Sequence, residues 1–92
     1  MTGSASRVLK IVNEKGLHAR ASAKLVEVVE RFDATAEVWR DGMSASGDSI
    51  MGLLMLAASK GTSIEVQTRG PQAEALADAV EALVGDRFGE EC

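Results

Sequence analysis

The feature that most constrains the fold is the alternation of two hydrophobic periodicities along 92 residues. Short segments with apolar residues at every second position are typical of strands, and longer segments with helical spacing are typical of helices. We expect strands over 7–13, 35–40, 43–46 and 62–68, and helices over 19–31, 49–58 and 71–84. The order strand, helix, strand, strand, helix, strand, helix favours an α+β two-layer sandwich.

A chain of this length forms one domain. We expect that domain to span 1–92, with an ordered core of about 7–85, a short N-terminal tail and an acidic C-terminal tail. Apolar residues make up 46% of the chain but aromatic ones only 3%. Phe32 and Trp39 are therefore expected to be the only large anchors of an aliphatic core.

Composition also excludes several classes of function. The net charge of −4, without a basic cluster, argues against nucleic acid as a ligand. No apolar run reaches the length of a membrane span and no signal peptide is visible, so we expect a soluble cytoplasmic protein. One histidine and one cysteine, Cys92, allow no internal disulfide and indicate neither a metal site nor a cofactor.

The expected second helix carries apolar residues nearly all round. Ser49 is a good N-cap for it, and Gly52 within it would allow close approach of another surface. A short helix on a small domain cannot bury every apolar side chain, so some of them should form a partner surface. The alternative is a tightly packed core helix. Before this helix, Asp41-Gly42 indicates a hairpin turn.

The only histidine, His18, lies between the first expected strand and the first expected helix. Gly16 permits a turn there, which would place the imidazole at a helix N-terminus, where unpaired N–H groups attract anions such as phosphate. Arg20 offers a guanidinium suited to phosphate oxygens, and Lys24 adds positive charge. Without these neighbours, a surface residue or a helix cap would be the simpler interpretation of His18.

Two motifs resemble the HPr family, the histidine phosphocarriers of the bacterial phosphotransferase system. The first resembles its active-site signature and reads Gly16-Leu17-His18-Ala19-Arg20. The second, over 48–56 and followed by Lys60-Gly61, is similar to the regulatory-serine helix of that family. The resemblance covers roughly 7–84, and the segment 64–83 looks most like the nitrogen-branch member, NPr. Where the family usually has proline after the arginine, this chain has Ala21.

The resemblance implies a specific fold and a specific reaction. The fold would be an open-faced sandwich, a four-stranded antiparallel sheet with three helices on one face. His18 would accept a phosphoryl group on Nδ1 from enzyme I, charged by phosphoenolpyruvate, and pass it to an enzyme IIA domain, with Arg20 stabilising the phosphate. The chain would be a monomeric carrier with a covalent phosphohistidine and not a free-standing enzyme.

The resemblance also implies regulation and docking. Ser49 would be phosphorylated by an HPr kinase/phosphorylase. The expected partner surface comprises Ala19, Lys24, Ile50, Met51, Gly52, Leu54 and Met55. Whether the acceptor serves sugar uptake or nitrogen and carbon regulation stays open. The alternative function is a regulatory module whose exposed second helix contacts a kinase or transcription factor without phosphoryl transfer.

Overall fold

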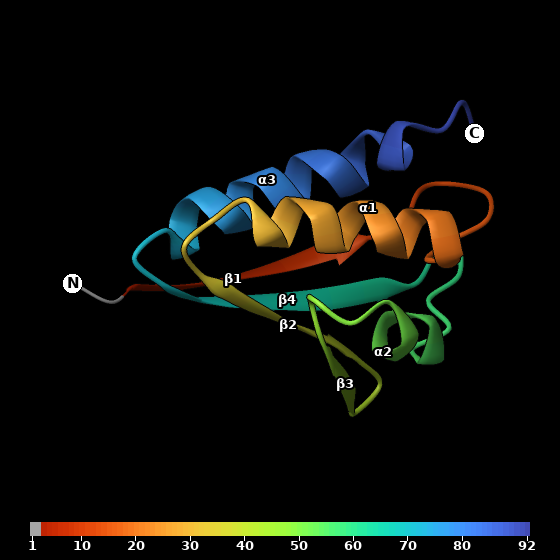
Figure 1. The fold of residues 1–92 in the computed structure, drawn as a ribbon. Coiled ribbons are helices and arrows are strands. Elements are labelled where there is room, and N and C mark those ends of the chain that lie inside the picture. The colour runs from red at the N-terminus through yellow and green to blue at the C-terminus, as the bar shows by residue number, and fades with distance from the viewer. Residues whose placement is uncertain (1–2) are drawn as a thin grey trace.

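The computed structural model describes residues 3–92 and has the expected order of elements (Figure 1). The strands are β1 (Gly3–Lys10), β2 (Thr35–Arg40), β3 (Met43–Ser46) and β4 (Ser63–Gly70). The helices are α1 (Ala19–Glu30), α2 (Ile50–Met55) and α3 (Ala73–Gly85), followed by a short 3-10 helix, η1 (Arg87–Gly89). No helix in this part of the chain is both long and apolar enough to cross a bilayer.

The four strands form one antiparallel sheet in the order β1-β4-β2-β3. Strand β4 lies between β1 and β2, and its Val66 lies opposite Arg7 of β1 and Val38 of β2. Helices α1 and α3 lie side by side over one face, and α2 packs beside α1 and β3 at one end (Figure 1). The predicted open-faced sandwich is therefore confirmed.

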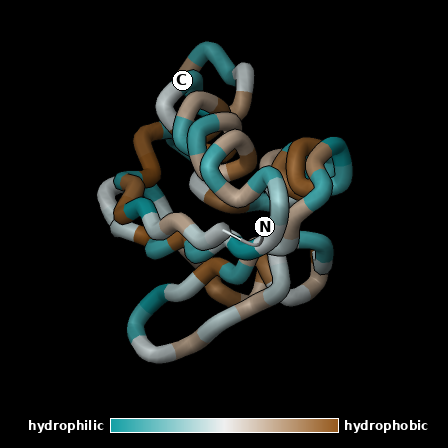
Figure 2. Tube along the Cα trace, turned by 90° about the vertical axis from the view of Figure 1, so that its left-hand side faces the viewer, coloured by the Kyte–Doolittle hydropathy of each residue, from teal (hydrophilic) through white to brown (hydrophobic). Residues whose placement is uncertain are grey.

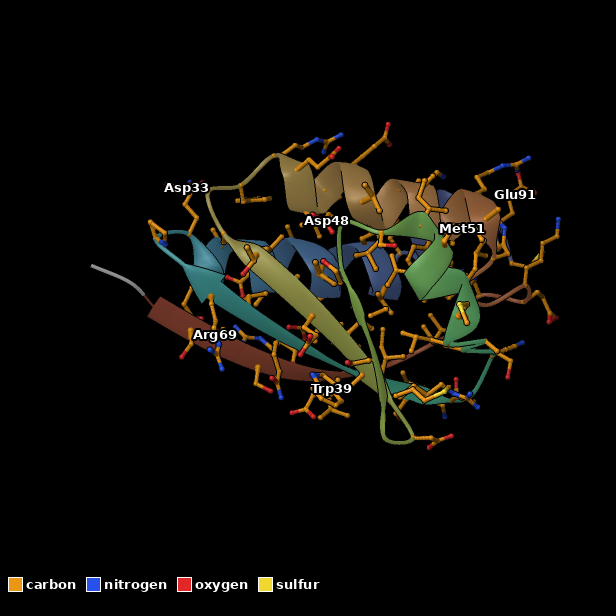
Figure 3. All side chains as sticks on the ribbon, turned by 60° about the horizontal axis from the view of Figure 1, so that its bottom comes forward. Asp33, Trp39, Asp48, Met51, Arg69 and Glu91 are labelled. Carbon is orange, nitrogen blue, oxygen red and sulfur yellow. The ribbon has the colours of Figure 1, made fainter. Side chains whose placement is uncertain are left out.

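The core lies between the helices and the sheet. Helices show alternating hydrophobic and hydrophilic residues around their turns (Figure 2), as helices with one buried face require. Fully or almost fully buried core side chains include Leu25, Val38, Ile64, Val66, Leu76 and Val80. Trp39 and Arg69 lie on the opposite, helix-free face of the sheet (Figure 3).

Several predicted boundaries were wrong by a few residues. Strand β1 begins at Gly3, because the ladder with β4 continues to the pair Gly3–Gly70. It ends at Lys10, because Lys10 pairs with Ser63, the first residue of β4. The first residues of that strand are small and polar and carry no hydrophobic signal. Helix α2 ends at Met55, shortly before Ala57 takes a left-handed φ of 51°. Helix α3 begins after Gln72, so Pro71 lies outside it.

The prediction of the aromatic anchors was also wrong. The largest fully buried side chain is Phe88, in the expected acidic tail, whereas Phe32 and Trp39 are only partly buried. Because Phe88 packs into the core, the segment after α3 follows a fixed path. The expected core boundaries of 7 and 85 therefore leave out a packed C-terminal segment as well as the start of β1.

Candidate functional site

His18 is the N-cap of α1. Its backbone is extended, with φ −80° and ψ −176°, and its carbonyl accepts the N–H of Ser22 at 2.8 Å. Its imidazole makes no capping hydrogen bond to the helix, and the side chain is about a quarter exposed. The ring is therefore accessible at a helix end whose first N–H groups lack intrahelical partners. This is the placement that the sequence predicted.

The loop before His18 is held by the segment that follows α2. The N–H of Leu17 donates to the carbonyl of Ala58 at 2.8 Å. Gly16 has a φ of 65°, and a Cβ there would overlap the Ala58 carbonyl oxygen and lie 2.9 Å from Cα of Ser59. Position 16 thus needs glycine both for its left-handed backbone and for this close approach.

A carboxylate from the C-terminal segment contacts the histidine ring. Nε2 of His18 lies within hydrogen-bond distance of Oε2 of Glu90. The other oxygen, Oε1, accepts from Nδ2 of Asn13 at 3.0 Å, and the same Nδ2 donates to the Gly16 carbonyl at 2.8 Å. The Asn13 hydrogen bond, followed by the His18 contact, holds the pKa of Glu90 below its ordinary value. A charged carboxylate is therefore favoured beside the ring.

Arg20 projects near this carboxylate from the first turn of α1. Its side chain is exposed and lines a shallow hollow of about 260 Å³. The other lining residues are Glu14, Lys15, Glu90, Glu91 and Cys92. Two cations and the helix start can attract an anion here, while the three carboxylates limit how tightly it is held.

The sequence model described as "PTS HPr component phosphorylation site" matches residues 5–86. The chain belongs to the HPr family. It is 44% identical over 80 residues to phosphocarrier protein HPr of Cupriavidus necator, covering 87% of this chain and 90% of that one. It is 41% identical over 86 residues to phosphocarrier protein NPr of Escherichia coli K12, covering 92% and 96%. These relatives confirm the resemblance and identify a phosphocarrier of the phosphotransferase system.

Solved structures agree with the family. The crystal structure of HPr-C-His from Thermoanaerobacter tengcongensis superposes with a TM-score of 0.91 at 31% identity, covering 96% of this chain and 99% of that one. HPr from Bacillus anthracis superposes with a TM-score of 0.84 at 32% identity, covering 89% and 98%. Both likenesses extend over nearly the whole HPr-like fold.

Helix α2 presents the apolar side chains expected of a docking surface in this HPr-family chain. Met51, Met55 and Ile50 are 70%, 76% and 39% exposed. Leu54 is half-buried, whereas Leu53 and Leu56 pack into the core. The alternative of a wholly buried core helix is therefore wrong. In Figure 3, Met51 and Glu91 lie at the same end of the molecule, so α2 and the C-terminal segment share that end.

The remaining predicted site residues have specific surroundings. Ser49 is the N-cap of α2, and its Oγ accepts the N–H of Gly52 at 3.1 Å, as predicted. A Cβ at Gly52 would lie 3.1 Å from Cβ of Ala45, so this glycine does allow close approach of α2 to β3. Ala19 is exposed beside His18. Lys24 is half-buried, and its ammonium donates to the Phe88 carbonyl at 2.5 Å.

Sequence reasoning missed two residues of the site, Asn13 and Glu90. Asn13 stood at the end of the expected first strand, 7–13, where nothing in the local pattern indicated a role for its side chain. Glu90 lies 72 residues from His18 and belongs to a segment without periodicity. The only signal in that segment was the isolated Phe88, an apolar residue in a polar tail.

Proposed function

We propose that this HPr-family carrier accepts a phosphoryl group from enzyme I, charged by phosphoenolpyruvate, on Nδ1 of His18. It then passes the group to an enzyme IIA domain. The observation that supports this most directly is an accessible imidazole at the N-terminus of α1, with Arg20 exposed in the same helical turn. The protein acts as a relay with a covalent intermediate, not as an enzyme with its own substrate pocket.

Transfer at such a site requires a group that is stabilised only moderately. Nδ1 attacks phosphorus, a nitrogen–phosphorus bond forms, and the bond from phosphorus to the donor breaks with its electron pair leaving on the donor. The start of α1 contributes about 0.3–1 kcal/mol toward holding the resulting anion. Arg20 adds charge-assisted hydrogen bonds. These interactions are strong enough to hold the phosphoryl group and weak enough to release it.

Docking and regulation complete the proposal. The partner surface comprises Ala19, Lys24, Ile50, Met51, Gly52, Leu54 and Met55. Ser49 caps α2 beside this surface, and a phosphate added to it by an HPr kinase/phosphorylase would place negative charge there. The carrier works as a monomer in the cytoplasm.

The exposure of Met51 and Met55 favours a second candidate function. Flexible methionine side chains suit a surface that accommodates a partner, so α2 could regulate a kinase or transcription factor by contact alone. This candidate needs no phosphoryl transfer.

Labelling separates the two functions. The chain is incubated with enzyme I and labelled phosphoenolpyruvate, and the product is tested for lability to acid and to hydroxylamine. We expect one acid-labile phosphoryl group per chain, no labelling of His18→Ala, and slower transfer in both directions for Arg20→Ala. Thermal melts of both variants control for folding. Labelling of His18→Ala at full stoichiometry would refute the assignment of His18.

A further inference from the structure

We propose that Glu90 is a positioning residue for phosphoryl transfer: its carboxylate accepts the Nε2–H of His18, leaves the Nδ1 lone pair free, and stabilises the ring as it becomes positive. The proposal deepens the function proposed above and rests on it for its kinetic part. The contact itself belongs to the unphosphorylated protein and can be tested without any partner.

Each oxygen of the Glu90 carboxylate has its own hydrogen-bonding partner. Oε2 faces Nε2 of His18, and Oε1 accepts from Nδ2 of Asn13. Asn13 is fully buried and also holds the carbonyl of Gly16. The Glu90 side chain is itself only 16% exposed. Because Asn13 fixes both the carboxylate and the loop before His18, the orientation of the ring is set from two sides.

The C-terminal segment is built to hold this carboxylate in place. Phe88 is fully buried, and its carbonyl accepts from Lys24 of α1. The carbonyl of Cys92 accepts the N–H of Glu14, in the same loop as Asn13, at 3.1 Å. Arg87 and Phe88 have φ values of 55° and 54°, in a region that non-glycine residues adopt only when their surroundings enforce it. The buried Phe88 before Glu90 and the backbone hydrogen bond of Cys92 after it therefore keep the carboxylate against the ring.

The chemical consequence concerns the two ring nitrogens. In a neutral imidazole one nitrogen carries the proton and the other has the lone pair. A carboxylate can only accept, so Glu90 selects the tautomer with the proton on Nε2. When Nδ1 bonds to phosphorus, Nε2 keeps its proton and the ring becomes positive until the group is passed on. A carboxylate at Nε2–H stabilises that charge, as a buried aspartate does for histidine in a hydrolase triad.

A competing role for the same contact is inhibition. The carboxylate adds negative charge near the site, which would repel an incoming phosphoryl group. If that repulsion outweighs the positioning effect, removal of Glu90 accelerates labelling. The two roles thus predict opposite changes in rate.

The first test is the ring tautomer of His18, read from its 15N chemical shifts at an alkaline pH where these shifts no longer change with pH. We expect the Nε2–H form to predominate in the wild type and in the control Glu27→Gln, which changes an exposed carboxylate on α1 outside the site. Glu90→Ala should give a mixture of both tautomers. An unchanged tautomer in Glu90→Ala would overturn the proposal, whatever the outcome of the labelling experiments.

The second test is the initial rate of labelling by enzyme I and labelled phosphoenolpyruvate. We expect Glu90→Ala and Glu90→Gln to be slower by about 10- to 100-fold, the usual effect of losing a hydrogen bond to a charged group. Glu27→Gln should stay close to wild type. Unchanged or faster labelling of Glu90→Ala would overturn the positioning role. If the wild type itself takes up no label, the proposed function fails and the tautomer comparison still decides the role of the Glu90 contact.

Discussion

Nδ2 of Asn13 donates to Oε1 of Glu90 at 3.0 Å, across 77 positions of the sequence. The hydrogen bond joins the loop before His18 to the C-terminal segment. Because Asn13 is fully buried, the loop and the C-terminal segment behave as one structural unit. Perturbing either one should therefore affect the other.

The first prediction concerns pH. The pKa of Glu90 lies below its ordinary value of 4.5, because of Asn13 first and His18 second. A carboxyl with a lowered folded-state pKa contributes stability that is present above the unfolded-state pKa and is lost as pH falls through the folded-state pKa. We expect wild type to melt at a higher temperature than Glu90→Gln at pH 7, and the difference to shrink below about pH 4.5. Thermal melts across this range are the measurement, and a difference independent of pH would contradict the expectation.

The second prediction concerns the left-handed glycine of the histidine loop. Gly16→Ala should be destabilising by about 2–4 kcal/mol, because backbone strain adds to overlap with Ala58. Gly61→Ala is the matched control, since Gly61 has a φ of 89° but nothing within 4 Å of an added Cβ. It should cost only the strain of about 1–2 kcal/mol. Urea unfolding measures both, and equal losses would show that the contact with Ala58 contributes little.

The sequence predicts a feature of this fold or site when the residues that determine it are neighbours in the chain. The Asp41-Gly42 hairpin, the Ser49 cap and the position of His18 follow from local backbone chemistry, so short motifs were sufficient. The contact between His18 and Glu90 depends on where the chain goes after α3. That path is determined by the burial of Phe88. This burial is a tertiary effect, which the local hydrophobic periodicity of the sequence does not indicate. Similarly, the first residues of β1 are strand only because β4 lies beside them.

The third prediction tests whether the buried Phe88 anchors the C-terminal segment. Phe88→Ala should cost about 3–5 kcal/mol of unfolding free energy, the usual range for a large buried aromatic side chain. The half-buried Phe32 provides a control of the same chemistry, and Phe32→Ala should cost clearly less. Because Phe88 holds the segment that carries Glu90, its loss should also give mixed His18 tautomers under conditions where the rest of the domain stays folded. Denaturant unfolding with 15N ring shifts measures both effects, and Phe88→Ala with a single tautomer would show that the anchor does not position Glu90.

The fourth prediction concerns the apolar surface of α2. Met51→Glu should leave the melting temperature nearly unchanged, because the side chain is 70% exposed, but should weaken binding to the phosphoryl donor. Leu53→Glu, two positions along the same helix, should unfold or strongly destabilise the domain, since Leu53 is fully buried and an unpaired buried carboxylate is costly. Melts paired with a binding titration separate these effects. Normal donor binding by Met51→Glu would place the docking surface elsewhere.

The last prediction separates the two roles of Ser49. Its Oγ accepts the N–H of Gly52, so Ser49→Ala should lose about 1 kcal/mol of stability, whereas Ser49→Asp can keep a capping hydrogen bond. Capping affects the stability of the protein, whereas the negative charge of Ser49→Asp should affect the rate of phosphoryl transfer. An aspartate beside Ile50 and Met51 should slow phosphorylation of His18 by enzyme I, because its negative charge repels the anionic phosphoryl group. Ser49→Ala should react at the wild-type rate.

Salt distinguishes this electrostatic effect from a change in shape. An exposed charge is screened over about 8–10 Å at moderate ionic strength, so the deficit of Ser49→Asp should shrink as salt rises. The measurement is the initial labelling rate of wild type, Ser49→Ala and Ser49→Asp at two salt concentrations. If Ser49→Asp matches wild type at low salt, Ser49 serves only as a cap. A deficit that persists at high salt would instead indicate that the substitution alters the packing of α2 against its partner.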